Sequence, residues 1–386
     1  MRRIRVLFLA PVAYFKGGAE RSLFDLMSNR SIDPVLVTPG PGSLAAAAEE
    51  RGVPVKHLDF VDVLSIHRPF NFLDGLKKAR SVIKATWALR SLCTTEQVEM
   101  LHSNGLKAHS LAVLCRLLGG PPVVVHIRDA PYTRGERIFW RLLAALASQT
   151  IVISTACWPG KILPRYVSLV PNGFRLPEVP SGSRRIMEPI TIGYVGRIHP
   201  NKGLHLLLKW MSAARDAGLD LRLRVRGLFA PEVPSYENEI LAAVRDLNLT
   251  HCVSFDGFIS ESSELYAGLD IVCVPSLDAE PFGRSVMEAM SMGLVVLATA
   301  SGGIKDLISD GNNGFFVNSA DEFTKIVRSL SKDEALVDRI RSNARRTCAE
   351  NYSMDRLYFN VNEVYEKTRS RRSTADAFGI RTDLRH

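Results

Sequence analysis

The decisive stretch of this chain reads Asp278-Ala-Glu280-Pro-Phe-Gly283-Arg-Ser285-Val-Met-Glu288-Ala-Met-Ser-Met-Gly293. Pro281 and Gly283 predict a turn, and residues 284–292 predict a short amphipathic helix that ends at Gly293. The start of a helix offers unpaired backbone N–H groups and the positive end of the helix dipole. The stretch therefore predicts a place where a phosphate can bind.

Two carboxylates flank this helix start. Glu280 lies in the loop just before it, and Glu288 lies about two turns into the helix, at ~1.5 Å of rise per residue, where it can face the same ligand. A phosphate site with two hydrogen-bond acceptors fits a sugar attached to a nucleoside diphosphate. A plain loop-to-helix junction with two solvated carboxylates has the same spacing, so the spacing alone leaves both interpretations open.

The whole chain alternates short β-rich apolar runs with longer helical patterns, which is typical of parallel α/β sheets. In the first half, helical patterns cover residues 20–28, 72–92 and 110–118, and strands are expected at residues 5–10, 34–38, 98–102, 123–126 and 150–153. Residues 167–170 lead to a turn at Pro171-Asn-Gly173. A stretch rich in Pro, Ser and Gly over residues 177–188 predicts a linker.

After this linker the α/β pattern starts again. Helical patterns cover residues 204–217, 237–247, 284–291 and 321–350, the last with a break near Lys332, and strands are expected at residues 190–195, 222–225, 253–255, 271–274, 295–298 and 314–317. We therefore predict an N-terminal domain over 1–176, a second domain over 189–353, a helix over 354–368 and a mobile basic tail over 369–386.

Composition limits the class of protein. The 386 residues are 46% hydrophobic and 23% charged, which indicates two ordinary globular domains. Six scattered cysteines without a C-x-x-C pair favour a reducing compartment over a disulfide framework or a zinc site. The basic and apolar opening resembles a signal peptide, but a glycine loop follows in place of a cleavage site, so we expect a buried first strand and a cytoplasmic protein.

The net charge of +9 is unevenly distributed. Residues 1–175 hold 23 Lys and Arg against 12 Asp and Glu, a balance of +11, and the remainder is close to neutral. A nucleic-acid-binding motif is not recognisable, so we expect no nucleic acid partner. An anionic lipid surface or a phosphorylated acceptor fits the charge, and so does a solvated face without a partner. The basic amphipathic stretch over 72–92 is the candidate for contact with the inner face of the plasma membrane.

Three further positions carry chemistry. The first strand of the second domain leads into a glycine-containing loop with two cations, Gly193-Tyr-Val-Gly196-Arg197-Ile-His-Pro-Asn-Lys202-Gly203. Arg197 and Lys202 can bind a diphosphate there. A surface loop with two solvated cations has the same sequence pattern, so that alternative stays open. Gly17-Gly18 holds the matching place in the first domain. His126 ends a predicted strand, where a polar donor can reach a ligand, although a structural histidine is the commoner case.

Together these motifs resemble the family-4 retaining glycosyltransferases of the GT-B fold, over nearly the whole chain to about residue 368. The most specific part is the E-x7-E pair, Glu280 and Glu288. The resemblance implies two doubly wound, parallel-sheet, Rossmann-like domains facing a central cleft, with the acceptor on the first domain and the nucleotide-sugar donor on the second. It also implies transfer of the sugar to a glycan or lipid-linked acceptor in polysaccharide or glycolipid synthesis.

The resemblance also implies a role for each motif. Glu280 would contact the transferred sugar and Glu288 the ribose, while His126 would hydrogen-bond the sugar. Arg197 and Lys202 would neutralise the leaving diphosphate. The remaining donor-binding positions are Gly17 and Gly18, Gly196, Gly257 and Ile259 near the base, and Phe282, Gly283, Arg284 and Ser285 around the distal phosphate.

Three departures limit this transfer of roles. Arg226-Gly-Leu-Phe-Ala-Pro231 replaces a glycine-rich turn, Asp306 stands where Glu is usual, and Ile-Arg128-Asp129 follows His126 where Asp is usual. The sequence has no D-x-D pair and no His/Cys cluster, so we expect neither a metal nor a cofactor. A nucleotide-sugar epimerase, a phosphorylase and a non-catalytic nucleotide-sugar-binding protein remain as alternatives.

Overall fold

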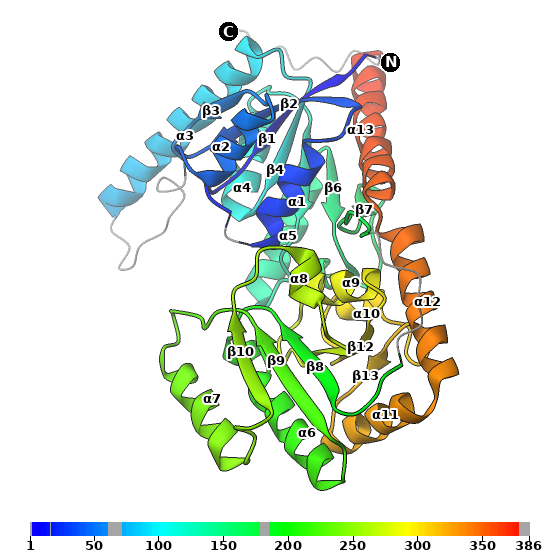
Figure 1. Ribbon diagram of the computed structural model, residues 1–386. Coiled ribbons are helices and arrows are strands. Elements are labelled where there is room, and N and C mark those ends of the chain that lie inside the picture. The colour runs from blue at the N-terminus through cyan, green and yellow to red at the C-terminus, as the bar shows by residue number, and fades with distance from the viewer. Residues whose placement is uncertain (1, 16, 61–71, 178–184, 378–386) are drawn as a thin grey trace. The chain divides into compact units, whose positions relative to one another are not determined.

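A computed structural model describes residues 2–15, 17–60, 72–177 and 185–377, and the chain divides into two compact α/β units (Figure 1). The first unit consists of Met1–Asn172 and Leu357–His386, and the second of Gly173–Arg356. The C-terminal segment therefore returns to the first unit after the second is complete.

The first unit is built on a parallel seven-stranded sheet in the order β3-β2-β1-β4-β5-β6-β7. The inner strands are almost wholly buried, as expected when helices cover both faces of a parallel sheet, whereas the edge strands β3 and β7 are partly exposed. The strands are β1 (Ile4–Leu9), β2 (Ile32–Thr38), β3 (Val55–His57), β4 (Met100–Asn104), β5 (Val123–Ile127), β6 (Gln149–Val152) and β7 (Val167–Leu169).

The helices of the first unit form two layers. From β1 the chain adds strands toward β3 at one edge of the sheet, and from β4 it adds strands toward β7 at the other edge. Because each crossover is right-handed, α1 and α2 lie on one face of the sheet, and α3, α4 and α5 lie on the opposite face. The packing of α1 on α2, and of α4 on both α3 and α5, agrees with this. The bounds are α1 (Gly18–Leu26), α2 (Ser43–Glu50), α3 (Phe72–Thr95), α4 (Leu106–Leu117), α5 (Arg134–Leu146), η1 (Thr155–Cys157) and α13 (Met354–Ala377).

The second unit has a parallel six-stranded sheet in the order β10-β9-β8-β11-β12-β13. Its strands are β8 (Ile190–Val195), β9 (Leu221–Arg226), β10 (Val253–Gly257), β11 (Ile271–Val274), β12 (Val295–Ala298) and β13 (Phe315–Phe316). Its helices are η2 (Pro200–Lys202), α6 (Leu204–Asp216), α7 (Ser235–Asp246), α8 (Ser262–Tyr266), α9 (Arg284–Ser291), α10 (Ile304–Leu307), α11 (Ala320–Lys332) and α12 (Glu334–Asn351).

Strand order reverses once in each sheet, between β1 and β4 in the first unit and between β8 and β11 in the second. The loops that leave the carboxyl ends of two such strands diverge to opposite faces of the sheet, and the crevice between them is where open α/β sheets bind ligands. Each unit therefore has one favoured place for a site.

Both predicted parallel sheets are confirmed, and several details differ from the prediction. The sequence prediction lacked the strands β3 and β7 and the helices α2, α5, α8 and α10. Residues 173–177 belong to the second unit, and the predicted linker falls largely on residues 178–184, outside the described residues. The last helix was expected to end at residue 368, but α13 continues to Ala377, so the first part of the expected mobile tail is helical. Residues 378–386 lie outside the description.

Candidate functional site

The switch point of the second unit brings Lys202 and Glu280 together. Lys202 ends the short η2 turn after β8, and Glu280 lies in the loop after β11, the neighbouring strand. The Lys202 ammonium forms an ion pair with Oε1 of Glu280, and Ser276 Oγ donates to the same oxygen at 2.7 Å. Both contacts use Oε1, so Oε2 of Glu280 is the oxygen that a ligand can use.

The backbone around Glu280 is held by the loop after β12. The N–H of Gly303 donates to the Glu280 carbonyl at 2.7 Å, and the Glu280 N–H donates to Ser301 Oγ at 3.4 Å. Gly302 has a φ of +52°, and a Cβ at this position would lie 2.2 Å from the Glu280 carbonyl oxygen. Only glycine fits there, so the loop after β12 fixes the position of the Glu280 side chain.

The turn before α9 is fixed by packing. Gly283 is the N-cap with a φ of +94°, and a Cβ there would lie 2.8 Å from a side-chain carbon of Ile304. Phe282 is buried and meets the Tyr352 ring edge-on at 6.0 Å, so its side chain anchors the loop instead of facing a ligand. In the first turn of the helix, the amides of Arg284 and Ser285 have no intrahelical acceptor and can bind an anion.

Glu288 lies inside the protein rather than in solvent. Its Oε1 accepts from Arg284 Nε at 2.7 Å and its Oε2 accepts from the Tyr266 hydroxyl at 2.9 Å. Burial, and then the nearby Glu288 charge, raise the pKa of Tyr266 well above its ordinary value. Each carboxylate oxygen accepts more than one hydrogen bond, so Glu288 keeps capacity for a ligand hydroxyl, with Arg284 and Tyr266 fixing its orientation. The sequence analysis did not find Tyr266, since α8 carries no motif.

Arg197 lies at the surface after β8. Its guanidinium is about half exposed and forms an ion pair with Glu232. The Tyr194 hydroxyl donates to the Arg197 carbonyl at 3.0 Å and so holds the turn that begins at Gly196. An exposed ion pair contributes about 0–1 kcal/mol, so an arriving diphosphate can displace Glu232 at little cost.

Gly257 ends β10 and Ile259 lies in the loop that follows; both were expected near the base. Phe255 and Phe229, from the ends of β10 and the loop after β9, lie 5.9 Å apart between ring centroids. Asp256 accepts from Arg224 at 2.8 Å and from Arg226 at 3.0 Å. Burial acts against it, but the two guanidinium groups hold the pKa of Asp256 below its ordinary value. These ion pairs join β9 to β10 near their carboxyl ends.

In the first unit, Gly17 and Gly18 are exposed at the start of α1. The Gly17 N–H donates to the Glu20 carboxylate at 2.9 Å, so this carboxylate caps the helix. The glycine pair thus lies in the loop after β1, on one side of the switch point, where the sequence places it.

His126, at the end of β5, belongs to a buried polar chain. Its Nδ1 lies 3.0 Å from Nε2 of His102 on the neighbouring strand β4, and Nδ1 of His102 lies 2.8 Å from the hydroxyl of Tyr365 on α13. Arg128 approaches His126 Nδ1 at 3.3 Å and also donates to Asn104 at 2.6 Å. All of these side chains are buried or nearly so.

The direction of these hydrogen bonds follows from Arg128, because a guanidinium only donates. Nδ1 of His126 is therefore the acceptor, which gives His102 a donating Nε2–H and an accepting Nδ1, and makes the Tyr365 hydroxyl the donor at the end of the chain. His126 then carries its proton on Nε2. Burial, and then the charge of Arg128, lower the pKa of His126 well below its ordinary value, so the ring is neutral.

Nε2 of His126 is a buried nitrogen without a hydrogen-bond partner among the described residues. A buried N–H that lacks a partner costs free energy in the ligand-free protein. Within the polar chain described above, the Nε2–H of His126 is the donor that has no acceptor among the described residues. The sequence analysis had singled out His126 alone; His102 and Tyr365 were missed because the contact between His102 and Tyr365 spans 263 positions.

Within the described ranges, no group of three or more His, Cys, Asp or Glu side chains is arranged to hold a metal ion. Among the same residues, every helix is too short or too polar to cross a membrane.

Family models match both units. Residues 178–347 match the model described as glycosyl transferases group 1, and residues 18–157 match the glycosyl transferase 4-like domain. The chain belongs to the group 1 glycosyltransferases. The Glu280 loop and the α9 start fall within the first match, and His126 and His102 fall within the second.

Curated relatives of this group 1 chain include named glycosyltransferases. The lipopolysaccharide 1,2-N-acetylglucosaminetransferase of Salmonella typhimurium is 32% identical over 188 residues, which cover 45% of this chain and 49% of that protein. A D-inositol 3-phosphate glycosyltransferase of Corynebacterium aurimucosum is 27% identical over 320 residues, 73% of this chain and 71% of that protein. The chain spans about half the length of the first relatives it matches.

Solved structures show the GT-B fold for this chain. The Anabaena protein Alr3699/HepE, solved with UDP and glucose, has a TM-score of 0.76 at 23% identity and covers 94% of this chain and 100% of its own. The outer core galactosyltransferase WaaB has a TM-score of 0.72 at 16% identity, over 94% of this chain and 99% of its own. At this level of identity the likeness concerns the fold.

Proposed function

We propose that this chain is a retaining glycosyltransferase that moves a sugar from a nucleoside diphosphate to an acceptor without a metal ion. The observation that carries the proposal is the Lys202–Glu280 pair at the β8/β11 switch point, next to the start of α9 in sequence. An ammonium and free helix-start amides suit a diphosphate, and the open Glu280 Oε2 suits a sugar hydroxyl.

In this proposal, negative charge that develops on the departing diphosphate is met by Lys202, Arg197 and the first amides of α9. Once the donor is bound, these groups would already face the diphosphate, so little reorganisation is needed as the sugar leaves. Lys202 is paired with Glu280 before a donor arrives, so donor binding would redirect the ammonium toward phosphate and release Glu280 for the sugar. His126 would donate from Nε2 to a hydroxyl of the transferred sugar.

A uridine nucleotide is the first donor to test, because Alr3699/HepE was solved with UDP and with UDP-glucose. A thermal-shift panel of nucleoside diphosphates and their sugars identifies the base and the sugar, since a ligand that binds the native state raises its apparent stability. Product analysis then tests the reaction. A glycoside with retained anomeric configuration supports the proposal, whereas an epimerised sugar nucleotide supports an epimerase, and donor binding without turnover supports a non-catalytic role.

The acceptor is proposed to be a growing cell-surface glycan or a lipid-linked precursor. Relatives named for lipopolysaccharide and for capsular polysaccharide biosynthesis in Staphylococcus aureus support this class. The test is incorporation of labelled sugar from the donor into a membrane fraction, compared with a delipidated glycan fraction.

We also propose peripheral contact with anionic membranes at the cytoplasmic face, through α3. Ile83 and Trp87 are each about half exposed on this helix, and Arg80 and Lys84 are exposed beside them at helical spacing. Apolar side chains that remain in solvent next to cations fit a lipid surface better than a plain solvated helix face. Co-sedimentation with vesicles should require anionic lipid and should weaken in salt and in Lys84→Glu. Binding that ignores lipid charge would contradict this contact.

A further inference from the structure

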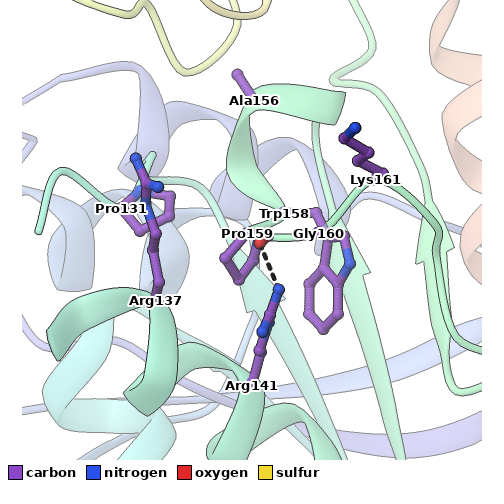
Figure 2. A pocket seen from close by; sticks show the side chains of 8 residues that line it. All are labelled: Pro131, Arg137, Arg141, Ala156, Trp158, Pro159, Gly160 and Lys161. Carbon is purple, nitrogen blue, oxygen red and sulfur yellow. Dashed lines mark hydrogen bonds between the residues drawn. The ribbon is translucent and has the colours of Figure 1, made fainter. Parts of the chain in front are cut away.

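A hollow of about 310 Å³ lies at the carboxyl edge of the sheet in the first unit, outside the residues discussed above (Figure 2). Pro131 follows β5, Arg137 and Arg141 lie on α5, and the far wall is the loop after β6, from Ala156 to Lys161. Three of its lining side chains are cations and none is a carboxylate.

The walls of this hollow are held by hydrogen bonds. Arg141 donates to the Pro159 carbonyl at 2.7 Å, drawn as the dashed line in Figure 2, and so ties α5 to the loop after β6. Trp158 is buried and donates from its indole nitrogen to the Ile162 carbonyl at 3.0 Å, which closes that loop on itself. The carboxylate of Glu136, next to Arg137, accepts from the backbone of Thr133 instead of neutralising the cations.

Apolar side chains that packing leaves exposed adjoin the cations on the same two elements. Ile138 is 62% exposed and Leu142 is 53% exposed, and the two are one turn apart on α5, beside Arg137 and Arg141. Ile162, next to Lys161, is 83% exposed. Single exposed apolar residues are ordinary, but here three lie on the two elements that supply the three cations, each next to a cation in sequence.

We propose that this hollow binds an acceptor that carries a phosphate or diphosphate on a hydrocarbon chain. Arg137, Arg141 and Lys161 would bind the phosphate oxygens, and guanidinium groups suit them because two N–H groups can be offered to one phosphate. The chain would lie on Ile138, Leu142 and Ile162. The inference rests on the proposed transferase function and narrows its acceptor from any glycan to a phosphorylated amphiphile.

The position in the fold agrees with this ligand. α5 belongs to the same helical layer as α3, whose exposed Trp87 and Ile83 are proposed to contact membrane. A substrate dissolved in a bilayer would reach its enzyme from that layer. The donor groups Lys202 and Glu280 belong to the other unit, so the hollow does not compete for the donor diphosphate.

Isothermal titration with geranylgeranyl diphosphate tests the proposal directly, because binding needs no turnover. We expect inorganic pyrophosphate and geranylgeraniol each to bind at least tenfold more weakly than the diphosphate ester. Arg137→Gln and Lys161→Gln should each weaken the ester about 5- to 10-fold, as expected for one charge-assisted contact. Ile138→Ser should weaken the ester but not pyrophosphate.

Arg245→Gln is the matched control, because Arg245 is an exposed arginine near the end of α7 in the second unit, and it should leave the affinity unchanged. All variants should keep the thermal shift with the nucleotide donor. Equal affinity of wild type and both charge variants for the ester would overturn the inference. The inference would also be overturned if Arg137→Gln and Lys161→Gln lost binding to phosphatidylglycerol vesicles but bound the ester as tightly as wild type. The cations would then bind the bilayer surface and not the acceptor.

The same measurements separate this inference from the proposed function. A protein that binds the donor and transfers sugar to a phosphate-free glycan, but does not bind the ester, would keep the transferase and lose the acceptor class. A protein that binds the ester with the expected variant pattern, but never transfers sugar, would lose the transferase and keep the site.

Discussion

The hydroxyl of Tyr365 is expected to support, together with Arg128, the form of His126 that carries its proton on Nε2, although Tyr365 and His126 do not touch. Tyr365 donates to His102, and His102 in turn donates to His126, at 2.8 and 3.0 Å. In Tyr365→Phe the accepting Nδ1 of His102 loses its donor inside the protein. His102 can then move its proton to Nδ1, so that its Nε2 accepts from a protonated Nδ1 of His126. Nε2 of His126 then loses its proton, and only Arg128, which approaches the same Nδ1, still opposes this form.

The magnitude follows from the value of each hydrogen bond. A buried acceptor left without a donor costs about 1–3 kcal/mol of stability, or roughly 2–10 °C in Tm for a unit of this size. Loss of one neutral hydrogen bond to the sugar costs about 0.5–1.5 kcal/mol, so kcat/KM should fall about 2- to 10-fold. Tyr358→Phe is the control on the same helix, since its hydroxyl donates to the Asp25 carbonyl at 3.0 Å and not to a histidine. It should affect stability only.

Two measurements separate orientation of His126 from general destabilisation. The ¹⁵N shifts of the imidazole nitrogens report the tautomer, and we expect a protonated Nε2 in wild type and a loss of this form in Tyr365→Phe. His102→Gln keeps an N–H near the place of Nε2 and should retain more activity than His102→Leu. If Tyr365→Phe and His102→Leu are both folded, keep kcat/KM within twofold and leave the His126 shifts unchanged, the relay does not operate.

Three other predictions concern the proposed chemistry and the buried histidines. Glu280→Gln should lower kcat about 10²–10³-fold with little change in donor KM. Glu288→Ala should mainly raise donor KM, because ribose contacts exist in ground and transition states alike. If both variants changed only KM, the assigned roles would be contradicted. Activity should survive EDTA, and loss that Mg²⁺ or Mn²⁺ restores would refute the metal-independent proposal. Burial, then the charge of Arg128, lower the pKa of His109 to about 3, and the same causes lower the pKa values of His102 and His126 well below 6.5. The unfolded chain therefore binds more protons than the folded protein below pH 6.5. The free energy of unfolding should be full above pH 6.5 and should fall as the pH decreases, by up to roughly 1.4 kcal/mol per pH unit for each histidine. A flat stability profile between pH 7.5 and 5 in urea titrations would contradict this.

Local hydrophobic periodicity is sufficient to predict the limits of a buried strand or helix when strong turn residues lie at both of its ends. The strands β8, β11 and β12 and the helix α9 have the predicted limits, because each is an apolar run that ends at glycine, proline or a polar cluster. The prediction failed for β3, which is three residues long and reads Val-Lys-His, and for α5, whose first turn contains Gly135. β3 forms because tertiary packing outweighs weak local preference, whereas α5 carries a start signal that the prediction missed, the capping box of Thr133 and Glu136.

The residues of the candidate site also fall into those that the sequence could predict and those that it could not. Glu280, Glu288 and the helix start lie on one segment, so their spacing could be read from the sequence. The pairing of Glu280 with Lys202 required only that their two strands be neighbours. Tyr266, by contrast, reaches Glu288 from a short helix without a motif, and nothing in its sequence surroundings indicates a hydroxyl donor.

The proton position on His126 shows why such partners matter. A histidine at a strand end has two possible neutral forms, and the sequence favours neither. His102 lies on the adjacent parallel strand, and the register pairs Val124 with His102, so His126, two residues on, projects from the same face of the sheet. The His102–His126 contact alone would allow either direction of donation. Arg128 determines the direction, because a guanidinium cannot accept a hydrogen bond and Nδ1 of His126 must therefore accept. The hydroxyl at the other end of the chain comes from Tyr365 on α13, which is available because the C-terminal segment returns to the first unit.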